Sequence, residues 1–258
     1  MQGARVGGKI VLSQFIQLPI EQLILAVLIV FAAFVITGIS GFGSGLIAIP
    51  MLAFFLPLPL VVAVLTLLSY GSTVIQSITL RQHTCWQEVW SLLPFTLVGI
   101  ALALLMLAHT DLQNMAVILG FFIAGYALYA LFDLKPLGGS RVWSIFAGGF
   151  GGFIGTLFGT GGPFYVIYLN LRQLDKSQFR ATIATTFLID GGVRVAGYAT
   201  IGYFTPQVLI LTLLLVPVLI VGLMIGHAIH FKINQRQFHL VINLMLLLSG
   251  CLLIIKSL

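Results

Sequence analysis

The segment GISGFGSGLIAIP, from Gly38 to Pro50, interrupts a strongly apolar stretch with four glycines and two serines. The apolar run that begins within it, 44–56, has thirteen residues and ends at PLP, 57–59. As a helix it would reach only about 20 Å, whereas the hydrocarbon core of a bilayer is about 30 Å thick. Glycine allows the backbone to turn at mid-depth. The segment therefore predicts a half-helix that starts inside a membrane and returns to the side from which it came.

Composition places the whole chain in a membrane. Of its 258 residues, 60% are hydrophobic and 7% are charged, whereas roughly a quarter of a soluble domain is charged. Continuous apolar runs favour helices over barrel strands, in which polar and apolar residues alternate. The net charge of +6 comes from Lys and Arg scattered through short loops. Without a basic cluster interleaved with aromatic residues, it does not indicate a nucleic-acid partner. We expect an all-α polytopic protein whose partner is the lipid bilayer.

The distribution of basic residues predicts which side each loop faces. The apolar segments lie at about 21–38, 44–56, 60–80, 88–108, 114–132, 142–158, 161–171, 179–201, 206–229 and 237–256. If the loops between them alternate between two sides, one side receives eight basic residues and the other receives three. By the positive-inside rule the first side is cytoplasmic, which predicts that both termini lie outside the inner membrane of a bacterial cell.

The two halves of the chain resemble each other. GFGSGLIAIPML (41–52) resembles GTGGPFYVIYLN (159–170), and LPFTLVG (93–99) resembles VPVLIVG (216–222). These similarities predict a duplicated unit of about five helices, and its odd number of crossings inverts the second copy, as in many secondary transporters. The predicted division is an N-terminal segment at 1–20, a first repeat at 21–133, a cytoplasmic linker at 134–141 and a second repeat at 142–258.

The paired glycine motifs predict a binding site near the bilayer midplane. A helix that starts inside the membrane directs its free N–H groups and the positive end of its dipole towards its neighbour. Two such ends, near Ser44 and Gly161, would converge from opposite sides and attract an anion, and the hydroxyls of Ser40, Ser44, Thr156 and Thr160 would add donors. The alternative is that the glycines only permit close helix packing, because Gly41/Gly45 and Gly151/Gly155 have small-xxx-small spacing.

GFGSG followed by Pro in the first half and GTGGP in the second resemble the TauE/SafE family of membrane transporters, also called the sulfite exporter or toluene sulfonate uptake family. The resemblance extends over nearly the whole chain. It implies transport of small sulfur-containing anions, such as sulfite or organosulfonates, in either direction.

Charged residues within an apolar segment need a physical reason, because each costs about 2.5–3.5 kcal/mol at the centre of a membrane helix. Asp190 and Arg194 are four residues apart and share one face of the eighth segment. One interpretation is a neutralising pair within the helix, which Gly191 and Gly192 could loosen. The other is that Arg194 binds the anion through its fork of donors and Asp190 carries a coupling proton or cation.

Neutral polar residues form a face on the corresponding segment of the first half. Ser69, Ser72, Thr73 and Gln76 follow helical spacing, and they either line the cavity or bond to a neighbouring helix. On the eighth segment, Thr182, Thr185 and Thr186 are candidates for the same cavity. Tyr165 and Tyr168 either contact substrate or mark an interface.

The predicted function is secondary transport of a small anion by alternating access. The alternative is an anion channel, or a permease for another small carboxylate or inorganic anion. The sequence contains no zinc-ligand cluster, Ser-His arrangement or nucleotide fingerprint, so we expect neither enzymatic activity nor a cofactor or metal. A monomer and a homodimer are both compatible with the sequence. The predicted coupling residue is Asp190, and the predicted substrate-binding residues are Ser40, Gly43, Ser44, Gly45, Ser72, Gln76, Thr160, Gly161, Gly162 and Arg194.

Overall fold

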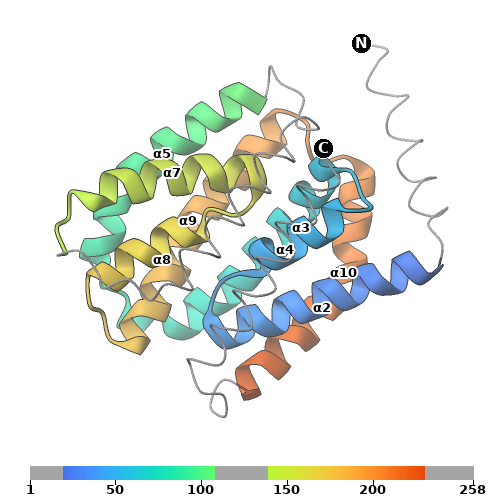
Figure 1. Cartoon of the computed structure of the whole chain (residues 1–258), viewed down its shortest axis with the longest axis horizontal. Coiled ribbons are helices and arrows are strands. Elements are labelled where there is room, and N and C mark those ends of the chain that lie inside the picture. Colours follow the sequence, from blue (N-terminus) through green and yellow to red (C-terminus); the bar gives the residue numbers. More distant parts are fainter. Residues whose placement is uncertain (1–19, 108–138, 230–258) are drawn as a thin grey trace.

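The computed structural model describes residues 20–107 and 139–229, and these ranges are folded into helices joined by short turns. The expected segments at 114–132 and 237–256 lie outside the described residues. Along the chain the elements are α2 (Ile20–Ser40), α3 (Ser44–Ala53), α4 (Leu58–Leu80), the 3₁₀ turn η1 (Arg81–His83), α5 (Trp86–Leu107), α7 (Trp143–Phe158), α8 (Gly162–Leu171), α9 (Lys176–Thr200) and α10 (Pro206–Ile229) (Figure 1).

The described helices confirm the all-α membrane class. Four spans are long and apolar enough to cross a bilayer, namely Ile20–Ser40, Leu58–His83, Trp86–Leu107 and Pro206–Ile229. With 25 residues α9 is equally long, but it carries four charged side chains. Large apolar side chains point outward from the bundle, among them Leu213 at 72% exposure and Ile78 at 67%. Such a surface suits contact with lipid rather than with water.

Two of the helices are too short to cross. Each of α3 and α8 has ten residues and is therefore about 15 Å long, half the thickness of the hydrocarbon core. Proline contributes to two of the boundaries here. Pro163 occupies the first turn of α8, where its missing N–H costs nothing, and Pro57 directly precedes α4.

Glycine makes the turn that precedes each short helix. Between α2 and α3 the backbone passes through φ +87° at Gly41 and +104° at Gly43, and between α7 and α8 it passes through +68° at Gly159. Residues with a Cβ rarely adopt these angles, whereas glycine adopts them freely. The chain can therefore reverse within a few residues and start a new helix, as the glycine motifs predicted.

The two glycine turns lie against each other inside the bundle. A Cβ atom on Gly45, in the first turn of α3, would collide with the carbonyl oxygen of Gly159 in the turn before α8. The beginnings of α3 and α8 therefore meet backbone to backbone, although more than a hundred residues separate them in the chain.

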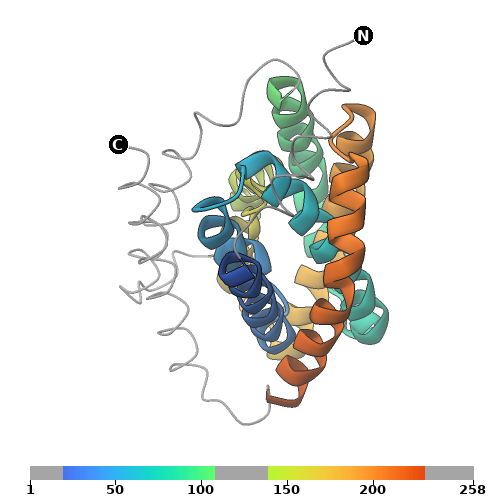
Figure 2. The ribbon, with the colours of Figure 1, turned by 90° about the vertical axis from the view of Figure 1, so that its right-hand side faces the viewer.

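The longer helices pack in pairs around the two short ones. Helix α5 packs along α7, α2 packs along α10, and α4 packs along α9. Each short helix packs on its preceding and following helix, so α3 contacts α2 and α4, while α8 contacts α7 and α9. The first two pairs lie on opposite sides of the bundle in Figure 1, and α10 runs along one flank in the perpendicular view of Figure 2.

Candidate functional site

A polar cavity of about 70 Å³ lies where the two glycine turns meet. It is bounded by the end of α2, the beginnings of α3 and α8, the middle of α4 and the second half of α9. The lining residues are Thr37, Gly41, Phe42, Gly43, Ser44, Gly45, Leu46, Thr66, Ser69, Tyr70, Ser72, Thr73, Gly159, Thr160, Gly161, Gly162, Phe187, Gly191 and Arg194. Since one liquid water takes up about 30 Å³, the space suits a few waters or a small ion.

Two helix N-termini face this cavity. The first backbone hydrogen bond of α3 runs from Ile47 N–H to Gly43 O at 3.3 Å, and that of α8 from Phe164 N–H to Gly161 O at 3.3 Å. The N–H groups before these residues have no partner within their own helices. Neither helix carries an acidic residue in its first turn. The positive ends of both helix dipoles are therefore not neutralised by their own helices.

Hydroxyl groups line the cavity between the two N-termini. Ser44 Oγ lies 3.0 Å from Ser69 Oγ, which joins the start of α3 to α4. Thr160 is buried at 1% exposure, and its Oγ1 has no hydrogen-bond partner among the described residues. A buried hydroxyl without a partner is costly. Thr160 therefore offers an unused donor and acceptor at the cavity wall.

Among the described residues that line the cavity, Arg194 alone carries a charged side chain. It is 8% exposed, and its Nη2 donates to Asp190 Oδ2 at 2.5 Å, one turn earlier in α9. Its Nε has no hydrogen-bond partner in the described part of the chain. The pair predicted from the sequence is thus formed, and the guanidinium at the cavity retains a free donor.

Asp190 lies behind Arg194 rather than in the cavity wall. Its carboxylate is 1% exposed, and its Oδ1 accepts no hydrogen bond from the described residues. The glycines that follow it do not interrupt α9, which runs continuously from Lys176 to Thr200. Instead they make room for the Tyr70 ring, because a Cβ on Gly191 would lie 3.0 Å from Tyr70 Cδ2.

Of the ten residues predicted to bind substrate, the structure brings eight to the cavity. These are Gly43, Ser44, Gly45, Ser72, Thr160, Gly161, Gly162 and Arg194. Two others are not in the lining. The Ser40 hydroxyl bonds to the backbone of its own helix end, at 2.9 Å to Ile36 O and 2.6 Å to Phe42 O. The Gln76 amide lies next to Gly41, one turn beyond the lining residues of α4.

The threonines of α9 that were candidates for the same cavity have another role. Cys85 N–H donates to Thr182 Oγ1 at 3.0 Å, and Thr185 Oγ1 lies 3.0 Å from Thr84 Oγ1. Thr186 bonds back to Thr182 O at 2.9 Å. Thr182 and Thr185 attach the α4–α5 loop to α9, and none of the three threonines lines the cavity.

Sequence reasoning missed several lining residues. Thr66 is one turn before Ser69 on the polar face of α4, so extending the helical spacing backward would have found it. Tyr70, Phe42 and Phe187 also line the cavity. No local pattern separates these aromatic residues from the many that pack elsewhere in the bundle.

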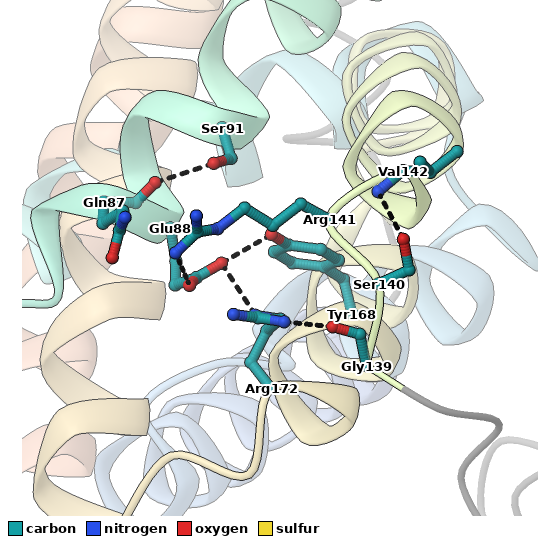
Figure 3. Close-up of polar contacts among 9 residues, drawn as sticks. All are labelled: Gln87, Glu88, Ser91, Gly139, Ser140, Arg141, Val142, Tyr168 and Arg172. Carbon is teal, nitrogen blue, oxygen red and sulfur yellow. Dashed lines mark hydrogen bonds and ion pairs between the residues drawn. The ribbon is translucent and has the colours of Figure 1, made fainter.

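A cluster of charged side chains was also missed (Figure 3). Glu88, near the start of α5, is 4% exposed and accepts a hydrogen bond from the Tyr168 hydroxyl at 2.5 Å. Its carboxylate also lies 3.1 Å from Arg172 Nε and 3.6 Å from Arg141 Nη2. Tyr168 therefore faces Glu88 and not the cavity, and Tyr165 donates to Thr96 Oγ1 at 3.4 Å. Among the described residues, no group of three or more His, Cys, Asp or Glu side chains is placed to hold a metal.

Apolar helices surround a buried cavity that carries polar groups, and two short helices begin at its wall. This arrangement is that of a multi-pass membrane protein. The family model for the sulfite exporter TauE/SafE matches residues 25–253, and the chain therefore belongs to this family, as its glycine motifs predicted. A relative from Cupriavidus necator, the probable sulfite/organosulfonate exporter TauE, is 24% identical over 197 residues, which cover 73% of this chain and 76% of the relative. No solved structure matches the chain.

Proposed function

We propose that this protein is a secondary transporter that moves a small sulfur oxyanion or organosulfonate across the inner membrane by alternating access. The observation that carries the proposal is the cavity at the meeting point of α3 and α8. It combines two unneutralised helix N-termini, an unpartnered hydroxyl on Thr160 and the guanidinium of Arg194. All of these groups donate hydrogen bonds, and a sulfur oxyanion offers several acceptor oxygens.

In this proposal the two halves of the chain are inverted repeats. The helix pairing supports it. When α2, α3, α4 and α5 are matched in order with α7, α8, α9 and α10, each packed pair of helices corresponds to another packed pair or to itself. Thus α5 on α7 corresponds to α10 on α2. The motif glycines have the same role in both: Gly99 packs against the α7 backbone at Phe153 N, and Gly222 packs against the α2 backbone at Phe31 O.

The residues have distinct roles in the proposed cycle. The N–H groups in the first turn of α3, the N–H of Gly162 at the start of α8 and the hydroxyls of Ser44 and Thr160 bind the anion, and Arg194 supplies the full positive charge. Glycines at 45 and 162 allow the backbone to approach it. Ser72, whose hydroxyl bonds to Ser69 O at 3.1 Å, supports the α4 wall, while Ser40 and Gln76 lie outside this first layer.

We further propose that Asp190 couples transport to protons. Asp190 holds Arg194 by a direct contact of 2.5 Å. An anion that binds Arg194 competes with this carboxylate. The contact of the carboxylate with Arg194 is then weaker, while the carboxylate itself remains buried. A buried carboxylate without a partner takes up a proton. Binding of the anion would in this way load a proton on the same helix.

Orientation follows from the basic loops. Arg81, Arg141 and Arg172 all belong to loops that the alternation assigns to the cytoplasmic side. Their end of the bundle therefore faces the cytoplasm, and the loop between α9 and α10 faces outward.

Charge movement across proteoliposome membranes tests the proposed function. Purified protein is exposed to rapid jumps of sulfite, thiosulfate, sulfoacetate, acetate and chloride, with and without a pH gradient. A saturable current restricted to one or two sulfur oxyanions and altered by the pH gradient is expected. A current that follows every anion without saturation would favour a channel, and a saturable current with acetate alone would favour a carboxylate permease.

A further inference from the structure

The Glu88 cluster lies at the cytoplasmic end proposed above and connects parts of the chain that are far apart in the sequence. Glu88 belongs to α5, Tyr168 lies near the end of α8, Arg172 directly follows α8, and Arg141 lies two residues before α7. Arg172 also donates to the carbonyl of Gly139. One carboxylate therefore holds two segments, the end of α8 and the loop before α7, to a helix of the first half (Figure 3).

The cluster is built around a buried charge. Glu88 is 4% exposed, and its Oε2 alone accepts the hydrogen bond of the Tyr168 hydroxyl at 2.5 Å and forms an ion pair with Arg172 Nε at 3.1 Å. The side chains of Arg172 and Arg141 are more exposed, at 22% and 47%. A buried carboxylate without such partners is strongly destabilised. Separating α8 from α5 would remove Tyr168 and Arg172 from Glu88, so the cluster opposes that separation.

The opposite end of α8 leads directly to the cavity. The helix is ten residues long and continuous, and its first residue, Gly162, lines the cavity. Fixing Tyr168 and Arg172 at one end therefore fixes the position of the helix N-terminus at the other, about 15 Å away.

In the described part of the first half, the corresponding end has no such cluster. The spacing of the glycine motifs pairs Tyr168 with Pro50 and Arg172 with Phe54, and that of the Pro–Gly motifs pairs Glu88 with Leu211. All three counterparts are apolar. Leu211 lines an apolar cavity of about 220 Å³ among α2, α3, α4 and α10, together with Leu52 and Leu56 beside α3. The short helix α8 is thus held by side-chain ion pairs and a hydrogen bond, whereas the short helix α3 borders an apolar cavity.

We propose that Glu88 is a positioning residue that locks the cytoplasmic end of the transporter by holding α8 to α5. The inference rests on the proposed alternating access, because a contact between the two halves at one end must break when that end opens. The structure is then the state closed at the cytoplasmic end, and opening there releases Tyr168 and Arg172 from Glu88.

The test measures access to the cavity from each side without any cargo. A single cysteine replaces Thr160 in a protein carrying Cys85→Ser and Cys251→Ser. It is labelled in vesicles of both orientations with 2-(trimethylammonium)ethyl methanethiosulfonate, a membrane-impermeant cation that does not belong to the proposed class of cargo. Tyr168→Phe removes one hydroxyl from the cluster and Glu88→Gln removes its negative charge. The matched control is Tyr165→Phe, which removes a hydroxyl from the same helix where it meets neutral Thr96.

We expect Tyr168→Phe and Glu88→Gln to speed labelling from the cytoplasmic side about tenfold or more, since hydrogen bonds to charged groups shift equilibria by that order. Labelling from the outer side should not rise, and Tyr165→Phe should match the parent. Unchanged labelling, or equal increases from both sides, would overturn the lock. Because Tyr168→Phe removes a single oxygen, it keeps the test usable if Glu88→Gln does not fold. The labelling needs no transported ion, so its result can be interpreted even if the transport experiment finds no cargo.

Discussion

The guanidinium of Arg194 lies at the cavity wall and donates to the Asp190 carboxylate at 2.5 Å, while Asp190 itself lies outside the lining. The two side chains are one turn apart on α9, and both are buried. Because the cation alone faces the cavity, an anion there meets Arg194 first and competes with Asp190 for it. The proposed roles in binding and in coupling therefore fall on two residues one helical turn apart.

Arg194→Gln should abolish anion binding. The variant loses both the charge and the free Nε donor at the cavity, and a hydrogen bond to a charged group is worth about 1.5–3 kcal/mol, so affinity should fall by at least tenfold. Isothermal titration calorimetry with thiosulfate in detergent measures it. The variant leaves Asp190 unpaired, which costs about 3–5 kcal/mol of folding free energy. The double variant Arg194→Gln/Asp190→Asn removes this penalty, and exposed Arg81→Gln controls for net charge. Retained affinity in the double variant would leave the pair a purely structural role.

Asp190→Asn should separate binding from coupling. The amide keeps the size of the side chain, but it carries no charge that competes with the anion for Arg194, and it does not take up a proton in the pH range of the transport experiment. We expect equal or tighter anion binding and loss of the proton flux that accompanies transport. Proteoliposomes loaded with a pH-sensitive dye and driven by an anion gradient measure this flux. An unchanged ratio of protons to anions would show that the coupling site lies elsewhere.

Thr160→Val should weaken anion binding without weakening the fold. Thr160 Oγ1 has no partner among the described residues, so its removal leaves no further group unsatisfied. A lost hydrogen bond of about 0.5–1.5 kcal/mol corresponds to a two- to tenfold drop in affinity. Thr156 is the matched control, because its hydroxyl is equally buried and unpartnered but does not line the cavity. Thr156→Val should leave affinity unchanged, and equal effects of the two substitutions would contradict the assignment of Thr160.

Gly45→Ala should destabilise the protein, because its methyl group would collide with the carbonyl oxygen of Gly159. Overpacking of this kind costs about 1–3 kcal/mol, and it falls where the two half-helices meet. Thermal unfolding in detergent checks it. Gly71→Ala is the control, since Gly71 is an exposed position of α4 and a Cβ there meets nothing within 4 Å. That change should be neutral or stabilising by up to about 1 kcal/mol. Equal melting temperatures for the two variants would mean that the close approach is not needed.

The local parts of the fold were predictable from the sequence. The length of the apolar run after Gly43 implied a helix too short to cross, and α3 has ten residues. The glycines themselves implied the turns, which the positive φ values at Gly41, Gly43 and Gly159 confirm. The spacing of Asp190 and Arg194 implied their contact. Each of these depends on residues near one another in the chain, where helix geometry sets the distances.

Other assignments depended on contacts between distant segments. Like Ser72, Thr182 and Thr185 are polar residues at helical spacing in an apolar segment. They nevertheless bond to the α4–α5 loop, because the rotation of α9 turns their face away from the cavity. Glu88 was unremarkable in the sequence. Its burial requires Tyr168 and Arg172, which lie eighty or more residues later.

Hydrophobicity and backbone freedom, which are properties of short segments, were therefore enough to identify a helical membrane protein with two glycine-started half-helices. The packing of α5 on α7 and of α4 on α9 decided which polar side chains share the cavity and which are used to hold the helices together. The physical reason is that a polar group buried in an apolar bundle must find a partner. Which partner it finds is set by the rotation and depth of the neighbouring helix, and no residue encodes these alone.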